Sequence, residues 1–473
     1  MKGNKHPTND VTVNPSGNPS IRDLIAPIAM DRRRFLSTAV QASALAAMGG
    51  FSTAGLLMPN TAHAAPIPAS NGFGGIGFES IAAKLAPVAN SVEVPAGYTV
   101  EVLAAWGQPI LPGAPDWNPD ASQTAADQLQ QFGMHNDGMH LFPFPTRGGP
   151  SNARALLCVN HEYTHEEILH GMDGLTGALG VTIAKVRKSQ AGHGMSVVEI
   201  RKSFGTNGDK WGIVKTSPYG RRITANTPMR MSGPAAGHAL LKSKKFSITA
   251  TGSIETGLND GYTAFGTHNN CAHGYTPWGT YLTCEENWNG NFGSNAVDPA
   301  PTDPAVSNGQ LRYGVTAAGF GYQWHVADPR FNARTNPLEP HLYGWVVEVD
   351  PFDPNSVPVK RTALGRMKKE STQVALSKDA HNTPNRVAFY IGDDERNEYV
   401  YKFVCAGVFN PTNRVANRDL MDSGILYVAK FTNTPGVSNG TYRGQWIALV
   451  PDTLTVIVAI PKCRSRRPRP PTI

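Results

Sequence analysis

The sequence predicts an all-β protein built from many short strands. Three observations support this fold class. The 473 residues include 48 Gly and 37 Pro, and only 17% are charged. From about residue 95 onward, short apolar runs rich in β-branched and aromatic residues alternate with Gly, Pro, Asn or Asp. No long amphipathic helix stands out. We expect strands at residues 98–103, 154–159, 196–200, 279–285, 343–350, 386–391, 399–404 and 425–431.

Two further segments have a specific expected structure. Residues 386–404 combine two apolar runs around an acidic turn, and this pattern predicts a β-hairpin. Residues 164–188 are the best candidate for helical content. Many short strands with turn signals are typical of a sandwich, a barrel or a propeller. The sequence has no strict repeat, so the pattern alone does not choose among these three architectures.

The N-terminus has the features of an export signal. Residues 32–36 read R-R-R-F-L, an Ala/Gly-rich run follows, and Ala62-His63-Ala64 offers a signal-peptidase site. The run lacks the roughly 20 apolar residues of a membrane span. We therefore expect residues 1–64 to be a twin-arginine signal peptide and predict a periplasmic or secreted protein. This pathway exports folded proteins, so a metal can be bound before export.

Residues 65–94 are expected to form a linker. They contain G-F-G-G-I-G at 72–77, which fits a dinucleotide-binding pattern. The pattern requires a preceding strand and an acidic residue for the ribose, and neither is present. We therefore interpret the segment as flexible chain rather than as a nucleotide site.

Charge and cysteine content exclude two further classes. The net charge of +7 comes from the signal segment and from a basic, Pro-rich tail at residues 461–473, so the body is close to neutral. A near-neutral body gives no reason to expect a nucleic-acid partner. The five cysteines are odd in number and form no Cys-x-x-Cys pair. They therefore indicate a free or metal-bound thiol rather than a disulfide framework.

One short motif suggests a zinc protease. Residues 160–169 read N-H-E-Y-T-H-E-E-I-L and contain H-E-x-x-H at His161, Glu162 and His165. The motif follows the strand-like run 154–159, so the two imidazoles need not share a helix face. Zinc binding by His161 and His165 therefore stays one alternative. A second is a polar strand end, and a third is a calcium site with oxygen donors from Asn160 and Glu162.

A denser cluster of chemical groups lies at residues 267–288. It holds an amide, Asn270, a thiol, Cys271, and paired carboxylates, Glu285 and Glu286. A Thr-Pro-Trp-Gly turn can fold the second strand onto the first, which would bring Glu285 to Cys271. A thiolate beside carboxylates suits a transition metal, and additional oxygens suit calcium. The alternative is a buried cysteine beside a solvated pair of glutamates.

Two shorter segments add candidates of the same kind. Arg366 could hold a phosphate through both guanidinium edges, and Glu370 could bind a metal. Residues 393–395 form an acidic turn. The alternatives are a surface ion pair and a charged hairpin turn.

These stretches together resemble the PhoX family of twin-arginine-exported, calcium-dependent alkaline phosphatases. The resemblance runs from about residue 95 to 450, and the block at 269–286 is the most specific. The matching blocks are F-G-M-H-N-D-G (132–138), V-N-H-E-Y-T (159–164), S-G-P-A-A-G-H (232–238), N-N-C-A-H-G-Y-T-P-W-G-T-Y-L-T-C-E-E (269–286), L-G-R-M-K-K-E (364–370) and I-G-D-D-E-R-N-E-Y-V-Y-K-F-V (391–404).

The resemblance implies a β-propeller over residues 95–460 around iron and calcium ions bridged by an oxo group. It also implies hydrolysis of phosphomonoesters, with arginines on the phosphate. By this resemblance Cys271 and Glu370 are iron ligands, and Arg366 acts on the phosphate. The calcium ligands implied are Glu285 and Glu162, with Asn160 and Asn270 as further candidates. H-E-x-x-H would then be an accident of the family's Asn-His-Glu-Tyr.

The sequence departs from the family pattern at two points. Lys369 stands where the family has a histidine before the glutamate, which places an ammonium beside a metal ligand. The chain also runs into the basic tail where family members continue into further metal- and phosphate-binding motifs. We therefore expect a C-terminally incomplete propeller, with an open sheet edge.

The leading hypothesis is an exported, metal-dependent phosphomonoesterase that uses iron and calcium. We expect a small phosphomonoester as substrate, the twin-arginine machinery as partner, no stable membrane span and a monomeric state. One alternative is a non-catalytic propeller fragment that still binds calcium. The other is a zinc endopeptidase that uses His161, Glu162 and His165.

Overall fold

The computed structural model of the chain describes residue 81 and residues 92–171, 174–204, 209–378, 384–433 and 442–450. The chain divides into two units. One comprises Met1–Glu101 with Thr432–Arg443, and the other comprises Val102–Phe431 with Gly444–Ile473. The site discussed below lies in the second unit. The predicted signal peptide, most of the linker and the basic tail lie outside the described residues.

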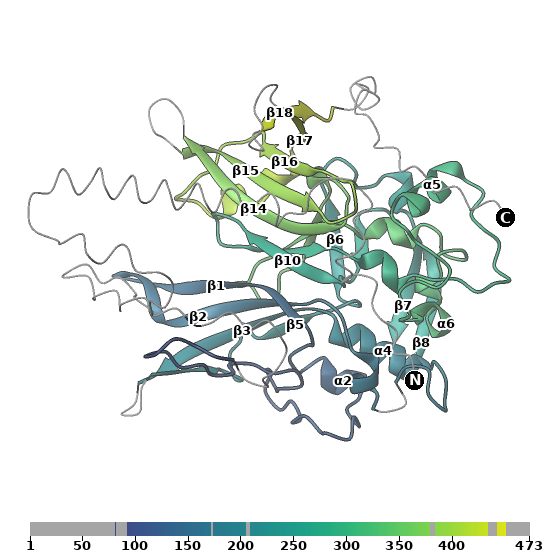
Figure 1. Ribbon diagram of the computed structural model, residues 1–473, viewed down its shortest axis with the longest axis horizontal. Coiled ribbons are helices and arrows are strands. Elements are labelled where there is room, and N and C mark those ends of the chain that lie inside the picture. The colour runs from purple at the N-terminus through teal and green to yellow at the C-terminus, as the bar shows by residue number, and fades with distance from the viewer. Residues whose placement is uncertain are drawn as a thin grey trace, which may run out of the picture. The chain divides into compact units, whose positions relative to one another are not determined.

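The protein is mostly β, as the sequence predicted (Figure 1). One sheet has the order β1-β2-β3-β4, with β5 also paired to β3. Its strands are β1 (Asn136–Thr146), β2 (Gly149–His161), β3 (Gly194–Ser203), β4 (Lys210–Ile213) and β5 (Arg221–Ile223). A separate hairpin pairs β7 (Lys244–Thr249) with β8 (Gly252–Leu258).

Two further sheets complete the described β-structure. The six-stranded sheet has the order β10-β11-β12-β13-β6-β9, and only its β13–β6 pair is parallel. Its strands are β6 (Pro228–Ser232), β9 (Thr263–Phe265), β10 (Asn270–Tyr275), β11 (Tyr281–Glu285), β12 (Val346–Val349) and β13 (Val359–Arg361). The third sheet runs β14 (Lys369–Lys378), β15 (Pro384–Asp393), β16 (Val400–Cys405), β17 (Gly424–Asn433) and β18 (Tyr442–Ala448). None of the sheets in the described part of the chain closes on itself, so the propeller stays a prediction.

The helices are short and lie between the strands. The α-helices are α2 (Ala125–Gln128), α3 (Glu166–Leu169), α4 (Ile183–Gly192), α5 (Pro304–Arg312) and α6 (Trp324–Ala327). The 3₁₀ turns are η3 (Ala239–Leu241), η4 (Trp288–Asn291), η5 (Pro329–Phe331), η6 (Glu339–Leu342), η7 (Thr362–Leu364), η8 (Val415–Asn417) and η9 (Leu420–Asp422). No helix in the described residues is long and apolar enough to span a membrane.

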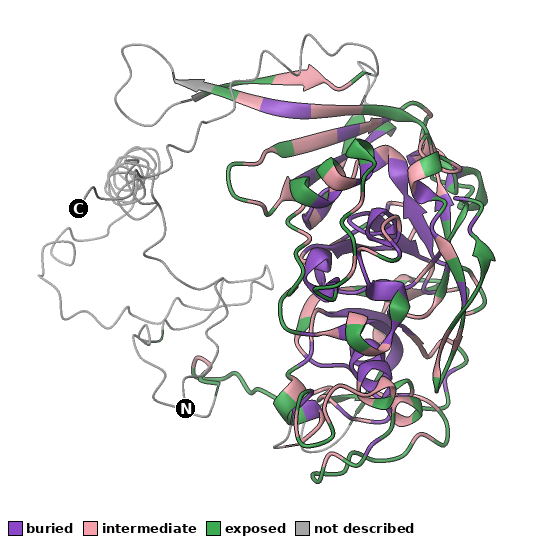
Figure 2. Cartoon of the chain, turned by 90° about the vertical axis from the view of Figure 1, so that its right-hand side faces the viewer, coloured by how far each residue is buried: buried purple, intermediate pink, exposed green. Residues whose placement is uncertain are grey.

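Burial explains why the central strands read as continuous apolar runs. All of β11 and β12 is buried, because both faces of the sheet are covered. The largest core cluster contains several aromatic side chains, among them Trp288, Trp324 and Tyr343. A second cluster lies between the six-stranded sheet and the third sheet and includes Phe389 and Phe403. In Figure 2 the buried residues accordingly lie mainly in the interior of the coloured ribbon.

Most of the expected strands are observed. The runs at 154–159, 196–200, 279–285, 343–350, 386–391, 399–404 and 425–431 all overlap strands, and β15 and β16 form the predicted hairpin. The strand expected at residues 98–103 is wrong. Val100 and Val102 there are exposed, so the β-branched side chains are not buried by a neighbouring strand. The helical content expected at 164–188 is present in α3 and the first part of α4.

Two glycines allow the backbones of three strands to approach closely. A Cβ atom at Gly138 of β1 would lie 2.9 Å from the carbonyl oxygen of Cys271 in β10. A Cβ atom at Gly274 of β10 would lie 1.7 Å from the carbonyl oxygen of Thr372 in β14. Real Cβ atoms do not come this close to backbone, so any side chain here would force the strands apart. β10 is thus held tightly between β1 and β14.

Gly274→Ala should therefore destabilise the protein. Because the new methyl group would overlap the backbone of β14, we expect the free energy of unfolding to fall by about 3 kcal/mol. Urea-induced unfolding followed by circular dichroism measures this change. Gly212→Ala in β4 is the matched control, because no atom lies within 4 Å of its added Cβ. Equal stability of the two variants would contradict the close approach.

Candidate metal centre

Four carboxylates and one thiol come together where β1, β2, β10 and β14 meet. Asp137 lies in a β-bulge of β1, and Glu162 directly follows β2. Cys271 belongs to β10, Glu286 follows β11, and Glu370 belongs to β14. Two overlapping groups, Asp137–Glu162–Cys271 and Cys271–Glu286–Glu370, each have their potential ligand atoms within 4.8 Å of one another. Cys271 is common to both groups and is the centre of the cluster.

The thiol of Cys271 contacts carboxylates from two different strands. Its Sγ lies 3.3 Å from Oδ2 of Asp137, and 3.5 and 3.6 Å from the two carboxylate oxygens of Glu370. These contacts depend on the two close approaches at Gly138 and Gly274, which fix β10 between β1 and β14. On the β2 side, the backbone N–H of Glu162 donates to the carbonyl of His135 at 3.0 Å. Each ligand candidate is thus held by rigid backbone.

Glu286 is the most deeply buried carboxylate of the cluster. It directly follows β11 and lies beside Asn269, which precedes β10 and has a left-handed backbone conformation with φ of 50°. The backbone N–H of Glu286 donates to the carbonyl of Asn269, and the amide of Asn287 donates to its Oε2. Its other oxygen, Oε1, is buried without a hydrogen-bond partner among the described residues. A buried carboxylate oxygen without a partner is costly unless a ligand satisfies it.

The cluster has strong electrostatic repulsion. Burial raises the pKa of Glu286 to about 9, and Asp394, Glu370 and Glu162 add to the effect. Burial raises the pKa of Glu162 to about 7, with Asp137 and Glu370 as further causes. Burial, Glu370 and Glu162 also raise the pKa of the Cys271 thiol. These acids resist ionisation because burial and like charges at short range disfavour the ionised forms, an effect that Lys368 opposes at Glu286.

A polyvalent cation fits this set of residues. It would reverse the electrostatic effect, favouring the ionised carboxylates and thiolate that the protein alone disfavours. It would also give the unpartnered oxygen of Glu286 a ligand bond. A thiolate is a soft donor that suits a transition metal, and carboxylates are hard donors that suit calcium. The cluster therefore matches a metal site with both kinds of donor.

Comparison with known proteins identifies the family. The family model for alkaline phosphatase PhoX matches residues 76–464. The chain belongs to the PhoX alkaline phosphatase family. A solved structure of Pseudomonas fluorescens PhoX in complex with vanadate, a transition-state analogue, is 44% identical, with a TM-score of 0.64. The alignment covers 76% of this chain and 56% of the Pseudomonas chain, so the chain spans little more than half of that relative. None of the curated proteins matches significantly.

Three of the residues expected to bind metal come together in the cluster around Cys271. They are Glu162, Cys271 and Glu370. Sequence reasoning missed Asp137 and Glu286. Asp137 lies inside the block F-G-M-H-N-D-G that carried the resemblance, and Glu286 is half of the noted carboxylate pair. Both signals were present, but their direction in space depends on strand register.

Glu285 lies on the other side of β11 from the cluster. The register pairs Asn270 with Glu285, so these two side chains share one face. Side chains alternate along a strand, so Cys271 and Glu286 occupy the opposite face. Glu285 instead forms a fully buried ion pair with Nζ of Lys360 at 2.7 Å. Its second oxygen accepts the backbone N–H groups of residues 344 and 345.

The two predicted asparagine ligands support the backbone of the cluster. The amide nitrogen of Asn160 donates to the carbonyl oxygens of Cys271 and Ala272, at 2.5 and 3.1 Å. Its oxygen accepts the hydroxyl of Tyr281 at 3.0 Å. The amide nitrogen of Asn270 donates to the hydroxyls of residues 267 and 283. In this structure both asparagines thus hold strands together.

Arg366 is engaged within the protein core. Its guanidinium donates to the carbonyl oxygens of Tyr343 and Pro340, at 2.7 and 2.6 Å. It also stacks against the rings of Trp288 and Tyr313. Burial lowers its pKa to about 10. The structure does not bring this side chain into the cluster of acids, and its role on the phosphate stays a prediction.

Lys369 does not point at the metal candidates. It is fully buried on the face of β14 opposite Glu370, and its Nζ donates to the carbonyl of Leu364 at 3.1 Å. The expected conflict between this ammonium and a bound metal is therefore absent. Burial lowers the pKa of Lys369 to about 8. The groups that oppose this effect are Cys284, Asp393 and Glu285, none of which belongs to the cluster.

The H-E-x-x-H motif lacks the geometry of a zinc protease. His161 is the last residue of β2 and is buried, with its ring nitrogens bonded to Asn136 and Ser196. His165 is exposed and caps α3, and its Nδ1 lies 2.8 Å from a nitrogen of His135. The two imidazoles have separate partners and do not share a helix, as the preceding strand-like run indicated.

The neighbouring glutamates should respond differently to loss of charge. Glu285→Gln leaves the buried ammonium of Lys360 unpaired, so we expect a loss of about 3–5 kcal/mol in unfolding free energy. Glu286→Gln removes a carboxyl without a cationic partner and should leave metal-free protein at least as stable. Urea unfolding after chelation measures both. The double variant Glu285→Gln/Lys360→Met should recover most of the loss. Equal losses for both single variants would contradict the assignment.

Proposed function

We propose that the chain is a metal-dependent phosphomonoesterase whose metal centre is the cluster around Cys271. The observation that carries this proposal is the convergence of Asp137, Glu162, Glu286 and Glu370 on the thiol of Cys271. Burial and neighbouring carboxylates raise the pKa of Glu286 there, although Lys368 opposes the rise. Membership of the PhoX alkaline phosphatase family supports the reaction class. The Pseudomonas relative was solved with vanadate, an analogue of the phosphoryl-transfer transition state, which supports phosphate chemistry in this family.

The donors of the cluster suit two kinds of metal. Each of the two groups combines Cys271 with two carboxylates. The soft thiolate would suit iron, and the hard carboxylate oxygens would suit calcium. Bound cations would supply Lewis-acid stabilisation of the negative charge that develops on the transferred phosphoryl group. We propose Glu286 in place of Glu285 as the ligand from the paired carboxylates.

The chain's own residues orient this centre. The strands hold Cys271 and Glu370 rigidly, and Asn160 binds the backbone carbonyls of Cys271 and Ala272. Lys368 is a cation close to the cluster, and its charge opposes the rise in the pKa of Glu286. It is bound to Glu395 of the acidic turn. A phosphate ester bound at the metals would therefore contact Lys368. Arg366 could contact the ester only if its guanidinium first released the carbonyl oxygens of Tyr343 and Pro340.

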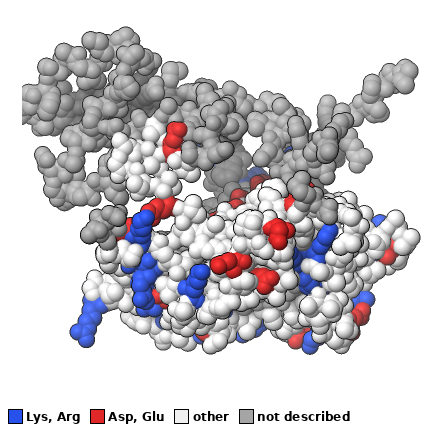
Figure 3. Space-filling model, turned by 90° about the horizontal axis from the view of Figure 1, so that it is seen from below, with Lys and Arg blue, Asp and Glu red and all other residues white. Residues whose placement is uncertain are grey.

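We also propose that the protein is exported by the twin-arginine pathway. The support is the R-R-R-F-L motif with its apolar run and Ala-His-Ala site. The face shown in Figure 3 mixes basic and acidic side chains without a large patch of one sign. On this face, the mixture agrees with the near-neutral body of the chain.

Replacing the central thiol tests the function. Cys271→Ala should lose bound metal and reduce hydrolysis of an aryl phosphate by more than about 100-fold, because the cation loses the ligand common to both halves of the cluster. Elemental analysis and a phosphatase assay with added calcium measure the two effects. Cys405→Ala is the matched control, since this buried thiol lies in the core of the third sheet. The proposal would be refuted if the wild-type protein bound no metal and did not hydrolyse the aryl phosphate.

A further inference from the structure

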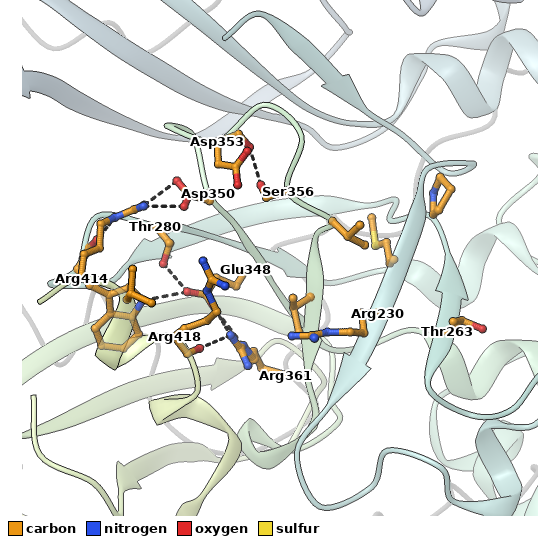
Figure 4. Close-up of a pocket in the computed structure, with 16 residues that line it drawn as sticks. Arg230, Thr263, Thr280, Glu348, Asp350, Asp353, Ser356, Arg361, Arg414 and Arg418 are labelled. Carbon is orange, nitrogen blue, oxygen red and sulfur yellow. Dashed lines mark hydrogen bonds and ion pairs between the residues drawn. The ribbon is translucent and has the colours of Figure 1, made fainter.

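A cavity of about 510 Å³ lies at the opposite end of β11 and β12 from the metal candidates (Figure 4). Glu348 of β12 lines it and pairs in register with Leu282 of β11. Glu286 lies four residues beyond Leu282, which corresponds to about 13 Å along an extended strand. The volume is in the range of small-molecule sites, about 300–1,000 Å³. The cavity is therefore separate from the proposed metal centre and large enough for a ligand.

Most charged groups in the cavity already have partners. Glu348 accepts two hydrogen bonds from Arg361, and it also accepts Thr280 and the indole N–H of Trp278. Arg361 also binds Asp422, outside the cavity. These contacts lock the acid and the base into one buried network, as the dashed lines in Figure 4 show. Neither group has spare capacity for a ligand.

The acids nearer the cavity rim are also occupied. Asp350 is bound through both oxygens by Arg414, at 2.6 Å each. Asp353 accepts the backbone N–H of Asn355, and its charge is felt by the guanidinium of Arg221. The negative charges that line the cavity are thus balanced within the protein.

Two arginines that line the cavity remain unbalanced. Arg230 of β6 and Arg418 after η8 are both exposed. Neither guanidinium has a hydrogen bond, an ion pair or a ring contact to any residue in the described ranges. An unpaired guanidinium presents a flat set of donors that matches carboxylate, sulfonate or phosphate oxygens. The cavity therefore has a net positive character.

The rest of the wall is largely apolar. The apolar residues are Pro228, Met229, Trp278, Val357, Val359 and Val415. A second cavity of about 440 Å³ shares Trp278 and Arg414 with the first and adds several proline and phenylalanine side chains. An apolar wall beside two free cations favours a ligand with an apolar body and one anionic group.

We propose that this cavity is a second small-molecule site that takes an amphipathic organic anion, held by Arg230 and Arg418. The apolar body of the ligand packs on Met229, Val359 and Trp278, and its anionic group accepts from the two guanidiniums. This site does not depend on the proposed phosphatase activity, because its residues are separate from the metal candidates.

Fluorescence titration with 8-anilinonaphthalene-1-sulfonate tests the proposal. N-phenyl-1-naphthylamine, the same molecule without the sulfonate, reports the apolar part of binding alone. Arg230→Gln/Arg418→Gln should weaken binding of the sulfonate about tenfold or more, and should leave binding of the uncharged compound unchanged. Circular dichroism and the melting temperature verify that the variant is folded.

Two controls separate this site from other causes. Arg147→Gln/Lys215→Gln removes two exposed positive charges outside the cavity and should leave sulfonate binding unchanged. Cys271→Ala alters the metal centre and should also retain binding. The proposal is overturned if the arginine variant binds the sulfonate as well as wild type does. Loss of binding in either control variant overturns it equally, because net charge or the metal centre would then be the cause.

Discussion

The backbone of β10 lies so close to β1 and to β14 that no side chain fits between them at Gly138 and Gly274. This steric constraint positions β10, which carries Cys271, between β1 and β14. The thiol of Cys271 therefore meets Asp137 of β1 on one side and Glu370 of β14 on the other. Strand spacing at ordinary distances would separate these groups by several ångströms. The arrangement of the site therefore depends on the two glycines as well as on the acids themselves.

The same close approach creates the electrostatic problem that a metal solves. Four buried or half-buried carboxylates share one small volume, and burial together with neighbouring carboxylates raises the pKa of Glu162, Glu286 and Glu370. A protein without bound cations has a reason to avoid such an arrangement, because like charges at short range oppose one another's ionisation. Two other buried acids are paired with arginines: Glu348 binds Arg361 and Asp328 binds Arg187. The cluster around Cys271 differs from these two pairs, and this difference makes it a candidate functional site.

The sequence predicted the kind of fold and the chemical groups of the site, but not which of two adjacent residues faces it. Strand positions were predicted from apolar runs bounded by turn residues. This prediction was wrong at residues 98–103, where Val100 and Val102 are exposed and no strand forms. Cys271 and Glu370 were expected as metal ligands from their blocks, and the structure brings them together. Glu285 was preferred to Glu286, and Lys369 was expected beside the metal, because residue type does not reveal which face of a strand a side chain occupies. A shift of one residue exchanges the two faces of a strand, and only the register Asn270–Glu285 settles the choice.

Glu285 and Glu286 illustrate how one chain can use the same side chain in two ways. Every oxygen of Glu285 is satisfied inside the protein by an ammonium and two backbone N–H groups, so its charge stabilises the fold. Glu286 keeps one buried oxygen without such a partner. An unmet hydrogen-bonding group costs stability, and proteins retain that cost chiefly where a ligand will meet it. The Lys360–Glu285 pair anchors the end of β11 from behind, so that Glu286 is presented rigidly to the cluster. Stability on one face of the strand thus supports an unsatisfied group on the other.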